Sequence, residues 1–293
     1  MKVLITGSSG FIGSYLVKEL SGHDITGIDT RDSRDARDYF RQDSHPHFDL
    51  VVHCAAVVGG RELIETQMAH AANLEIDAAL FGWAERAEPG RVVYISSVSA
   101  YPGYLQQGAH EIYPGVTIPA TTLEEGHIRL HSLLGFPDEL YGWAKLTGEI
   151  LASRSSIPVS VVRPFTVYGE GQDPVFPFAN IAAQFRQHRD PVTVWGSGNQ
   201  VRDFIHVSDV AKAIITMAGK GIPGPVNLCT GRAVSLRDLT GLFAEQAGYA
   251  PDIKLIDKPE GLVRRVGNPD RMHEFYTPQV SLEEGVRKAL KGP

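Results

Sequence analysis

The feature that most constrains the fold is the start of the chain, where an apolar run leads into a glycine-rich loop and then into a helical pattern. Residues Val3–Thr6 are typical of a buried parallel strand, which Gly7 ends. The loop has the spacing Gly7-x-x-Gly10-x-x-Gly13. A strand, a glycine turn and a helix in this order form the context of a dinucleotide-binding turn, with the pyrophosphate at the helix N-terminus. Three glycines in a flexible loop are the alternative interpretation.

The next strand pattern supports a dinucleotide and indicates which one. Residues Ile25–Ile28 lead to Asp29, which stands 22 residues after Gly7. A carboxylate at this place can accept hydrogen bonds from ribose hydroxyls, and it would repel a 2′-phosphate. The sequence therefore favours NAD over NADP. Arginines that alternate with aspartates follow, and they indicate a solvated helix face more than a phosphate site: Arg31, Arg34 and Arg37.

Apolar runs alternate with helical patterns as far as Pro164, which predicts an α/β fold with a Rossmann-type, doubly wound parallel sheet. The further runs cover residues 48–56, 91–97 and 159–164. After Pro164 loops, short strands and helices follow in a less regular order. We therefore expect a smaller α+β C-terminal substrate domain.

The domain boundaries follow from this change of pattern. Residues 1–164, with parts of 204–230, are predicted to form the NAD-binding domain, and residues 165–203 and 231–293 the substrate-binding cap. Within the cap, Ser281 and Glu284 have the spacing of a capping box at a helix start.

A tyrosine and a lysine four residues apart, Tyr141 and Lys145, share one face of a predicted helix. A phenol titrates near ~10 in water, and a neighbouring ammonium favours the phenolate, which makes the tyrosine a usable acid or base. Alone, such a pair is more often part of an exposed helix face. Ser96 and Ser97 end the strand at 91–97, at the rim where open α/β sheets bind ligands. A serine-rich turn is the alternative there.

Composition excludes several classes. The net charge of −6 is spread over interspersed acidic and basic residues, so the chain lacks the basic footprint of a nucleic-acid or membrane-surface protein. Cys54 and Cys229 indicate reduced, buried thiols and hence a cytoplasmic protein. The run at Val3–Thr6 is too short for a signal peptide or a membrane span. Histidine pairs such as His127 and His131 lack the partners of a zinc site, so we expect no metal.

Taken in order, these motifs resemble the extended short-chain dehydrogenase/reductase family, in its NAD-dependent epimerase/dehydratase group. The resemblance spans nearly the whole chain and rests on the following stretches: Thr6–Gly13, His53–Ala56, Asn73, Ile95–Ser97, Tyr141 with Lys145, Arg163 with Pro164, Val167–Gly169, and Val201–Val207 with Asp209.

The resemblance implies NAD on the first domain and a nucleotide-activated sugar beneath the second. It implies Ser97, Tyr141 and Lys145 as catalytic residues. The implied cofactor-binding residues are Gly7, Gly10, Phe11, Ile12, Gly13, Asp29, Ala55, Ala56, Asn73, Ser96, Tyr141, Lys145, Pro164 and Val167. The implied substrate-binding residues are Ser97, Val98, Arg202 and Arg265, of which Arg202 is similar to an arginine that pairs with a substrate phosphate. It also implies a homodimer built on the helices around 73–85 and 141–153.

Three departures from the family pattern stand out. Ser97 and Tyr141 are 44 positions apart, so the segment 102–138 is this protein's own. The stretch from Asp29 to Asp49 is short, and we expect a strand common there to be reduced or missing. The late phosphate motif of the family is represented only by residues 258–261 and the arginines after them.

The reaction is chosen by elimination within the family. Dehydratases place an acid/base pair after the catalytic serine, where this chain has Val98 and Ser99, and 3,5-epimerising relatives place a cysteine at Val98. C4 epimerisation through a transient 4-keto intermediate needs no such group and is the first choice. A sugar ketoreductase or dehydrogenase is the alternative, and so is a dehydratase that takes its acid from Glu111, Glu124 or Glu125. A non-catalytic NAD-binding sensor is a distant third.

Overall fold

The computed structural model of the chain describes residues 1–114, 116–128, 136–257 and 261–292. His131 and residues 258–260 of the late phosphate motif lie outside this part. A parallel sheet of six strands has the order β12-β7-β4-β3-β1-β2. Its strands are β1 (Lys2–Thr6), β2 (Asp24–Ile28), β3 (Leu50–His53), β4 (Val92–Ile95), β7 (Val159–Pro164) and β12 (Val226–Leu228). The predicted Rossmann-type sheet is confirmed.

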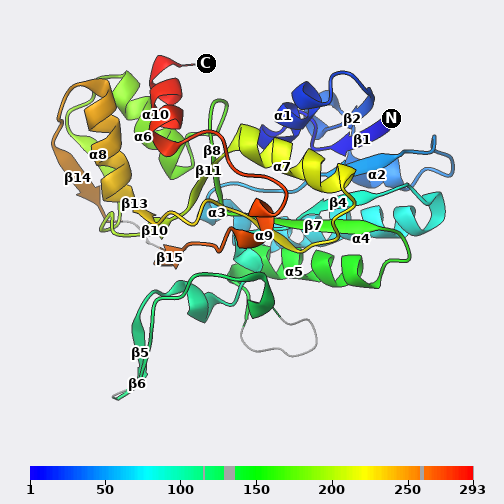
Figure 1. The fold of residues 1–293 in the computed structure, drawn as a ribbon, viewed down its shortest axis with the longest axis horizontal. Coiled ribbons are helices and arrows are strands. Elements are labelled where there is room, and N and C mark those ends of the chain that lie inside the picture. Colours follow the sequence, from blue (N-terminus) through cyan, green and yellow to red (C-terminus); the bar gives the residue numbers. More distant parts are fainter. Residues whose placement is uncertain (115, 129–135, 258–260, 293) are drawn as a thin grey trace.

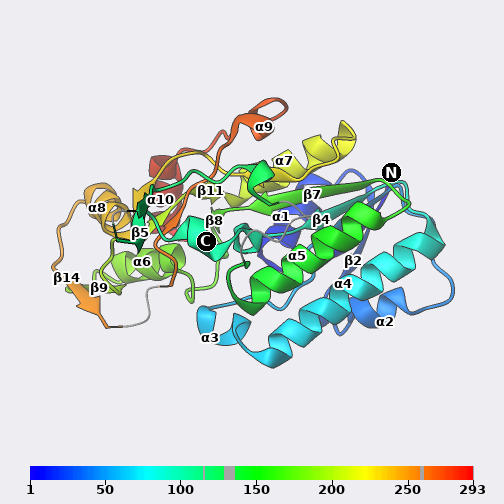
Figure 2. The same cartoon turned by 90° about the horizontal axis from the view of Figure 1, so that it is seen from below.

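Helices cover both faces of this sheet, as Figure 1 shows. The helices α1 (Phe11–Glu19) and α7 (Val207–Gly219) pack on one face, where Leu16 and Ile214 join the strand residues in one apolar cluster. On the opposite face lie α2 (Ala36–Phe40), α4 (Gln67–Ala87) and α5 (Glu139–Arg154), and Figure 2 shows α4 and α5 side by side there. Burial on both faces explains why the strands are continuous apolar runs.

The sheet ends at β2. A strand common in the family was expected to be reduced or missing between Asp29 and Asp49, and the described residues of this stretch form no strand. Instead, the chain forms η1 (Thr30–Asp32) and α2 before it returns to β3. Arg37 pairs with Asp35 at 2.7 Å and with Glu75 at 2.9 Å, which agrees with the predicted solvated charged face.

A second apolar cluster lies beside the sheet, between α6 (Pro177–Arg186), α8 (Leu236–Ala247) and α10 (Leu282–Lys291). Phe178, Phe185 and Phe243 form its centre. Small sheets complete this part, and their strands are β8 (Thr166–Tyr168), β9 (Val192–Trp195), β10 (Val201–Arg202), β11 (Phe204–His206), β13 (Val234–Ser235), β14 (Ile253–Ile256) and β15 (Arg264–Arg265). The short helix α9 (Asp270–His273) precedes α10.

One predicted cap is wrong in part. The Ser281 hydroxyl accepts a hydrogen bond from Glu284 N at 3.2 Å and caps α10. The Glu284 carboxylate does not return to Ser281, because it pairs with Lys288 one turn later at 2.9 Å. A complete capping box occurs at α8, between Ser235 and Asp238.

The segment 102–138 carries η3 (Gly103–Gln106), the hairpin of β5 (His110–Tyr113) and β6 (Val116–Ile118), and η4 (Glu125–His127). The hairpin extends away from the rest of the chain in Figure 1. A bridge from Pro102 to Pro137 joins the two ends of the segment, and a bridge from Leu123 to Gly267 holds its middle. Among the described residues, no helix is long and apolar enough to cross a membrane.

Candidate active site

The glycine loop forms a tight cradle at the start of α1. Gly7 has φ +69°, a left-handed conformation that side-chain-bearing residues rarely adopt. A Cβ on Gly13 would overlap the carbonyl oxygen of Gly7. Gly10 caps α1 without a side-chain hydrogen bond, which leaves N–H groups of the first turn to meet an anion. The loop therefore fits the pyrophosphate of a dinucleotide.

Substituting Gly13 by alanine is expected to displace the Gly7 carbonyl and to weaken NAD binding by about tenfold or more, equivalent to about 1.4 kcal/mol. Calorimetric titration with NAD measures this loss. Gly22→Ala is the matched control, because a Cβ there meets open space. Equal NAD affinity in the two variants would contradict the role of the Gly7–Gly13 contact.

Asp29 follows β2 and contacts the glycine loop. Its carboxylate accepts hydrogen bonds from Ser9 N at 3.0 Å and from Arg31 N at 2.9 Å. The side chain is largely buried at the C-terminal edge of the sheet, where the dinucleotide ribose was predicted. Asp29 therefore also joins the glycine loop, through Ser9, to η1, through Arg31.

The small residues after β3 are held by Asn73 of α4. The Asn73 amide accepts from Val57 N at 2.7 Å and donates to Val57 O at 2.9 Å. Ala55 N donates to the Thr6 hydroxyl at 3.3 Å. Asn73 therefore shapes the strip Ala55–Val57, and its predicted direct contact with the cofactor remains a prediction.

Tyr141 and Lys145 lie on one face of α5, as the spacing predicts. Lys145 is 2% exposed, and its Nζ lies 5.9 Å from the centre of the Tyr141 ring. Burial raises the pKa of Tyr141, and the charge of Lys145 opposes this rise without overcoming it. Lys145 therefore favours the phenolate, as its spacing from Tyr141 predicts, and burial acts in the opposite direction.

Ser97 lies two residues after the end of β4 and caps η2 (Val98–Ala100), where its hydroxyl accepts a hydrogen bond from Ser99 N at 3.1 Å. Ser99 O in turn accepts from Asp138 N at 3.0 Å, immediately before α5. The end of β4 and the start of the helix that carries Tyr141 are thereby tied together. Such a tie brings the predicted serine and tyrosine to one edge of the sheet.

Behind the pair lies a buried ion pair that the sequence pattern did not reveal. Glu149, one turn after Lys145, accepts from Arg163 Nε at 2.9 Å and from Arg163 Nη2 at 2.7 Å. Ser96 donates its hydroxyl to the same carboxylate at 2.5 Å. The Ser96 side chain therefore faces α5, so any cofactor contact of Ser96 would come from its backbone.

The Arg163 guanidinium continues this network across the sheet. Arg163 Nη1 donates to the Tyr101 hydroxyl at 3.1 Å, which donates to Asn227 Oδ1 at 2.7 Å. Asn227 Nδ2 donates to Leu123 O at 3.0 Å. The network joins the loop after β4 to α5, β7, β12 and Leu123, which precedes η4.

The predicted substrate arginines lie side by side, because β10 and β15 pair in parallel with Arg202 opposite Arg265. Arg265 donates to Gln106 at 2.7 Å and pairs with Asp138. Burial, with the charges of Arg265 and Arg61, lowers the pKa of Arg202. Guanidinium groups that crowd together in this way favour an anionic ligand.

The other predicted residues take ordinary places around the site. Val98 is buried in an apolar cluster with Tyr101 and Phe165. Pro164 ends β7, and Val167 pairs with Ile205 between β8 and β11. Phe11 and Ile12 start α1. Within the described ranges, no cluster of histidine, cysteine, aspartate and glutamate could hold a metal ion.

The model of the NAD-dependent epimerase/dehydratase family matches residues 3–229. The chain belongs to this family. Its members are NAD-dependent enzymes, so this chain is an enzyme whose cofactor is NAD.

The relatives of this epimerase/dehydratase cover nearly its whole length. An uncharacterized UDP-glucose epimerase of Bacillus subtilis (strain 168) is 26% identical over 99% of the chain and 97% of its own length. A dTDP-4-dehydro-6-deoxy-D-allose reductase of a Streptomyces species is 27% identical over 97% and 95%. The crystal structure of the Thermus thermophilus UDP-glucose 4-epimerase with NAD superposes with a TM-score of 0.79 at 23% identity, over 99% and 98% of the two chains.

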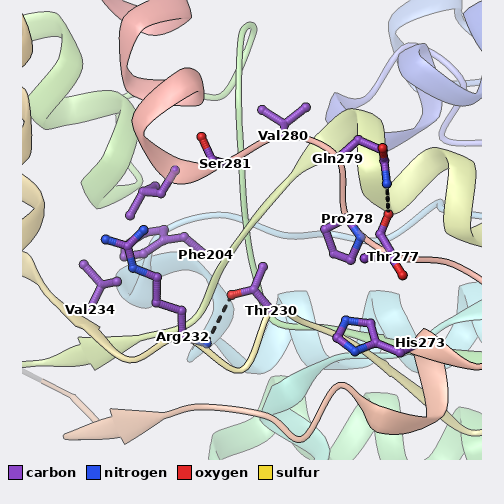
Figure 3. A pocket seen from close by; sticks show the side chains of 11 residues that line it. Phe204, Thr230, Arg232, Val234, His273, Thr277, Pro278, Gln279, Val280 and Ser281 are labelled. Atoms are coloured by element: carbon purple, nitrogen blue, oxygen red, sulfur yellow. Dashed lines mark hydrogen bonds between the residues drawn. The ribbon is translucent and has the colours of Figure 1, made fainter.

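A separate cavity of about 320 Å³ opens on another part of this epimerase/dehydratase (Figure 3). Residues of 230–234 and 273–282 line it, and Figure 3 shows Arg232 and His273 on opposite sides of Thr230. Arg232 also pairs with Glu283 at 2.7 Å. The lining includes none of the predicted site residues, so the cavity is distinct from the candidate active site.

Three polar residues near the candidate site were missed from sequence: Asp77, Glu149 and Arg61. Glu149 lies at i+4 from Lys145, so helical spacing was a usable signal. Asp77 lies one turn after Asn73 on the buried face of α4. Arg61 starts α3 (Arg61–Ile64) and pairs with Glu65 and Glu139, and nothing local in the sequence connects it with Arg202.

Proposed function

We propose that this epimerase/dehydratase inverts C4 of a nucleotide-activated sugar through a transient 4-keto intermediate and keeps its NAD throughout. The observation that carries the proposal is the combination of Ser97, Tyr141 and Lys145 at one sheet edge with an apolar, buried Val98 beside them. That combination supplies the first proton transfer and lacks the acid that elimination of water requires. The epimerase among the relatives supports this choice.

The residues divide the work of the proton transfer. NAD, when bound, takes up a hydride and returns it. Tyr141 removes the proton of the sugar hydroxyl and later gives it back, and Lys145 stabilises the phenolate while it exists. Ser97 donates a hydrogen bond that orients the same hydroxyl. A 4-keto sugar that turns over between the two transfers presents its other face and yields the inverted alcohol.

In this proposal, the nucleotide end of the substrate binds to the guanidinium groups of Arg202 and Arg265. A diphosphate there would replace Asp138 as the partner of Arg265. We also propose that residues 1–164 with parts of 204–230 carry the NAD, and that residues 165–203 and 231–293 cover the sugar nucleotide.

The test is incubation with UDP-glucose or UDP-galactose and a catalytic amount of NAD. Interconversion of the two sugars without accumulation of NADH is the expected result. A strict stoichiometric requirement for NADH or NADPH would overturn the epimerase and favour a sugar ketoreductase. That second candidate rests on the reductase among the relatives, because reduction needs only the same serine, tyrosine and lysine.

Arg202→Gln is expected to raise KM for the sugar nucleotide by about a hundredfold with a smaller change in kcat, because a half-buried charge partner of the diphosphate is lost. Steady-state kinetics measure both constants. Arg287→Gln, on the exposed side of α10, is the control and should leave KM unchanged. An unchanged KM in the Arg202 variant would place the diphosphate elsewhere.

We further propose a homodimer that works in the cytoplasm. The helices α4 and α5 pack against each other and carry exposed apolar side chains, among them Met68 (83% exposed) and Ile150 (41%). A second copy that adds its own α4 and α5 would cover these groups. Light scattering in solution gives the mass, and a monomer at micromolar concentration would contradict this interface.

A further inference from the structure

A buried carboxylate lies behind the acid–base pair, on the other helix of this face. Asp77 of α4 is 2% exposed, and its Oδ2 accepts a hydrogen bond from the Tyr94 hydroxyl at 2.5 Å. An isolated carboxylate in such a place would be strongly unfavourable, so its charge must be balanced nearby. The charge of Lys145 and the hydrogen bonds of Asp77 outweigh burial and lower the pKa of Asp77, which keeps it ionised.

Tyr94 connects Asp77 to Lys145. The Lys145 Nζ lies 5.0 Å from the centre of the Tyr94 ring, within the range of a cation–π contact, and 5.9 Å from the centre of the Tyr141 ring. The hydroxyl of the same Tyr94 ring donates to Asp77. One aromatic ring therefore contacts the ammonium with its face and the carboxylate with its hydroxyl.

The other carboxylate oxygen of Asp77 faces His53, at the end of β3. Asp77 Oδ1 is 3.3 Å from His53 Nε2, and His53 Nδ1 is 2.8 Å from the Thr6 hydroxyl. Burial lowers the pKa of His53, so the imidazole is neutral and adds no positive charge of its own. Thr6 also accepts from Ala55 N. Lys145 is thus the cation that Asp77 balances.

We propose that Asp77 is a positioning residue of the active site, which holds Lys145 beside Tyr141 by way of the Tyr94 ring and balances the lysine charge inside the fold. This inference rests on the proposed roles of Tyr141 and Lys145. The negative charge of Asp77 also opposes ionisation of Tyr141, so Asp77 helps to set the pH at which the tyrosine becomes a base.

The titratable groups that face this site come from four elements and from the loop after β3. They are His53 of β3, Cys54 of that loop, Asp77 of α4, Tyr94 of β4, and Tyr141, Lys145 and Glu149 of α5. Burial raises the pKa of Cys54 to about 12, so its thiol is neutral. Glu149 is already matched by Arg163 through two hydrogen bonds. Asp77 is therefore the carboxylate whose charge acts mainly on Tyr141 and Lys145.

Two variants change this interaction in opposite directions. Asp77→Asn keeps the shape and removes the charge, so Tyr141 should ionise at lower pH than in the wild type. Tyr94→Phe keeps the charge and removes the hydroxyl, which frees the carboxylate to draw Lys145 away from Tyr141. Tyr141 should then ionise at higher pH, and kcat should fall by about tenfold or more as the lysine is displaced.

The experiment follows Tyr141 directly by its tyrosinate absorbance, as the difference between each protein and the same protein with Tyr141→Phe. The pH profile of kcat/KM is recorded in parallel. Glu75→Gln is the control, because Glu75 lies on the exposed face of α4 and pairs with Arg37. In the Glu75→Gln variant, Tyr141 should titrate at the same pH as in the wild type.

Shifts in opposite directions for Asp77→Asn and Tyr94→Phe support the proposal, since a purely structural role would not separate them. Wild-type titration in both folded variants overturns it. Should Asp77→Asn not fold, the Tyr94→Phe shift to higher pH decides alone. If the wild type turns over no sugar nucleotide, the proposed function fails, but the absorbance titration still tests the role of Asp77.

Discussion

Tyr141→Phe is expected to lower kcat by about a thousandfold while NAD remains bound, which is the middle of the range for loss of a positioned acid or base. The phenylalanine ring keeps the packing on α5 next to Lys145, so the loss reports the hydroxyl. Burial raises the pKa of Tyr141, and the lysine charge works against that rise. A residue in this balance is suited to exchange a proton with a sugar hydroxyl in both directions.

Turnover of the sugar nucleotide and the amount of bound NAD are measured on the same preparation. Tyr104→Phe is the matched control, because Tyr104 lies in η3 and is 42% exposed. It should retain wild-type kcat. Full activity of the Tyr141 variant would contradict the role of Tyr141 as the acid and base. A wild-type protein that binds NAD without any turnover would favour the non-catalytic NAD-binding sensor.

Arg163→Met is expected to lower the free energy of unfolding by about 3–5 kcal/mol, because it leaves the Glu149 carboxylate buried without its cation. Arg163 and Glu149 are 1% and 4% exposed and share two hydrogen bonds. The Ser96 and Tyr101 hydroxyls lose order with them. Urea unfolding of the purified variant measures the change.

Two further variants separate burial from charge. Arg232→Met breaks the exposed pair with Glu283 and should cost about 0–1 kcal/mol. The double variant Arg163→Met with Glu149→Met removes both buried charges and should recover part of the lost stability. A double variant as unstable as Arg163→Met alone would show that the unpaired charge is not the cause.

Much of the fold was predictable because local patterns and the fold agree. Gly7–Gly13 between an apolar run and a helix predicted β1, the cradle and α1, and the periodic runs predicted the parallel strands. The strands of two residues in the second part were not predictable. The strands β10 and β15 are defined by their pairing, in which Arg202 lies opposite Arg265, and pairing is a long-range property.

The candidate site was predictable to a similar extent. Tyr141 and Lys145 are close in sequence, so helical spacing alone places them on one face. The partners of Lys145 come from other elements. Asp77 lies on α4 and Tyr94 on β4, and only the packing of α4 and α5 on the same face of the sheet brings them together. The same holds for Glu149 and Arg163.

The sequence by itself therefore determined the parallel sheet, the NAD cradle and the tyrosine–lysine pair, because each depends on residues within one turn or one strand–loop–helix unit. Only the tertiary structure decided what lies behind the pair and beside Arg202. A buried charge needs a counter-charge, and in this fold that partner comes from another strand or helix. The proton affinity of Tyr141 is accordingly a property of the packed protein.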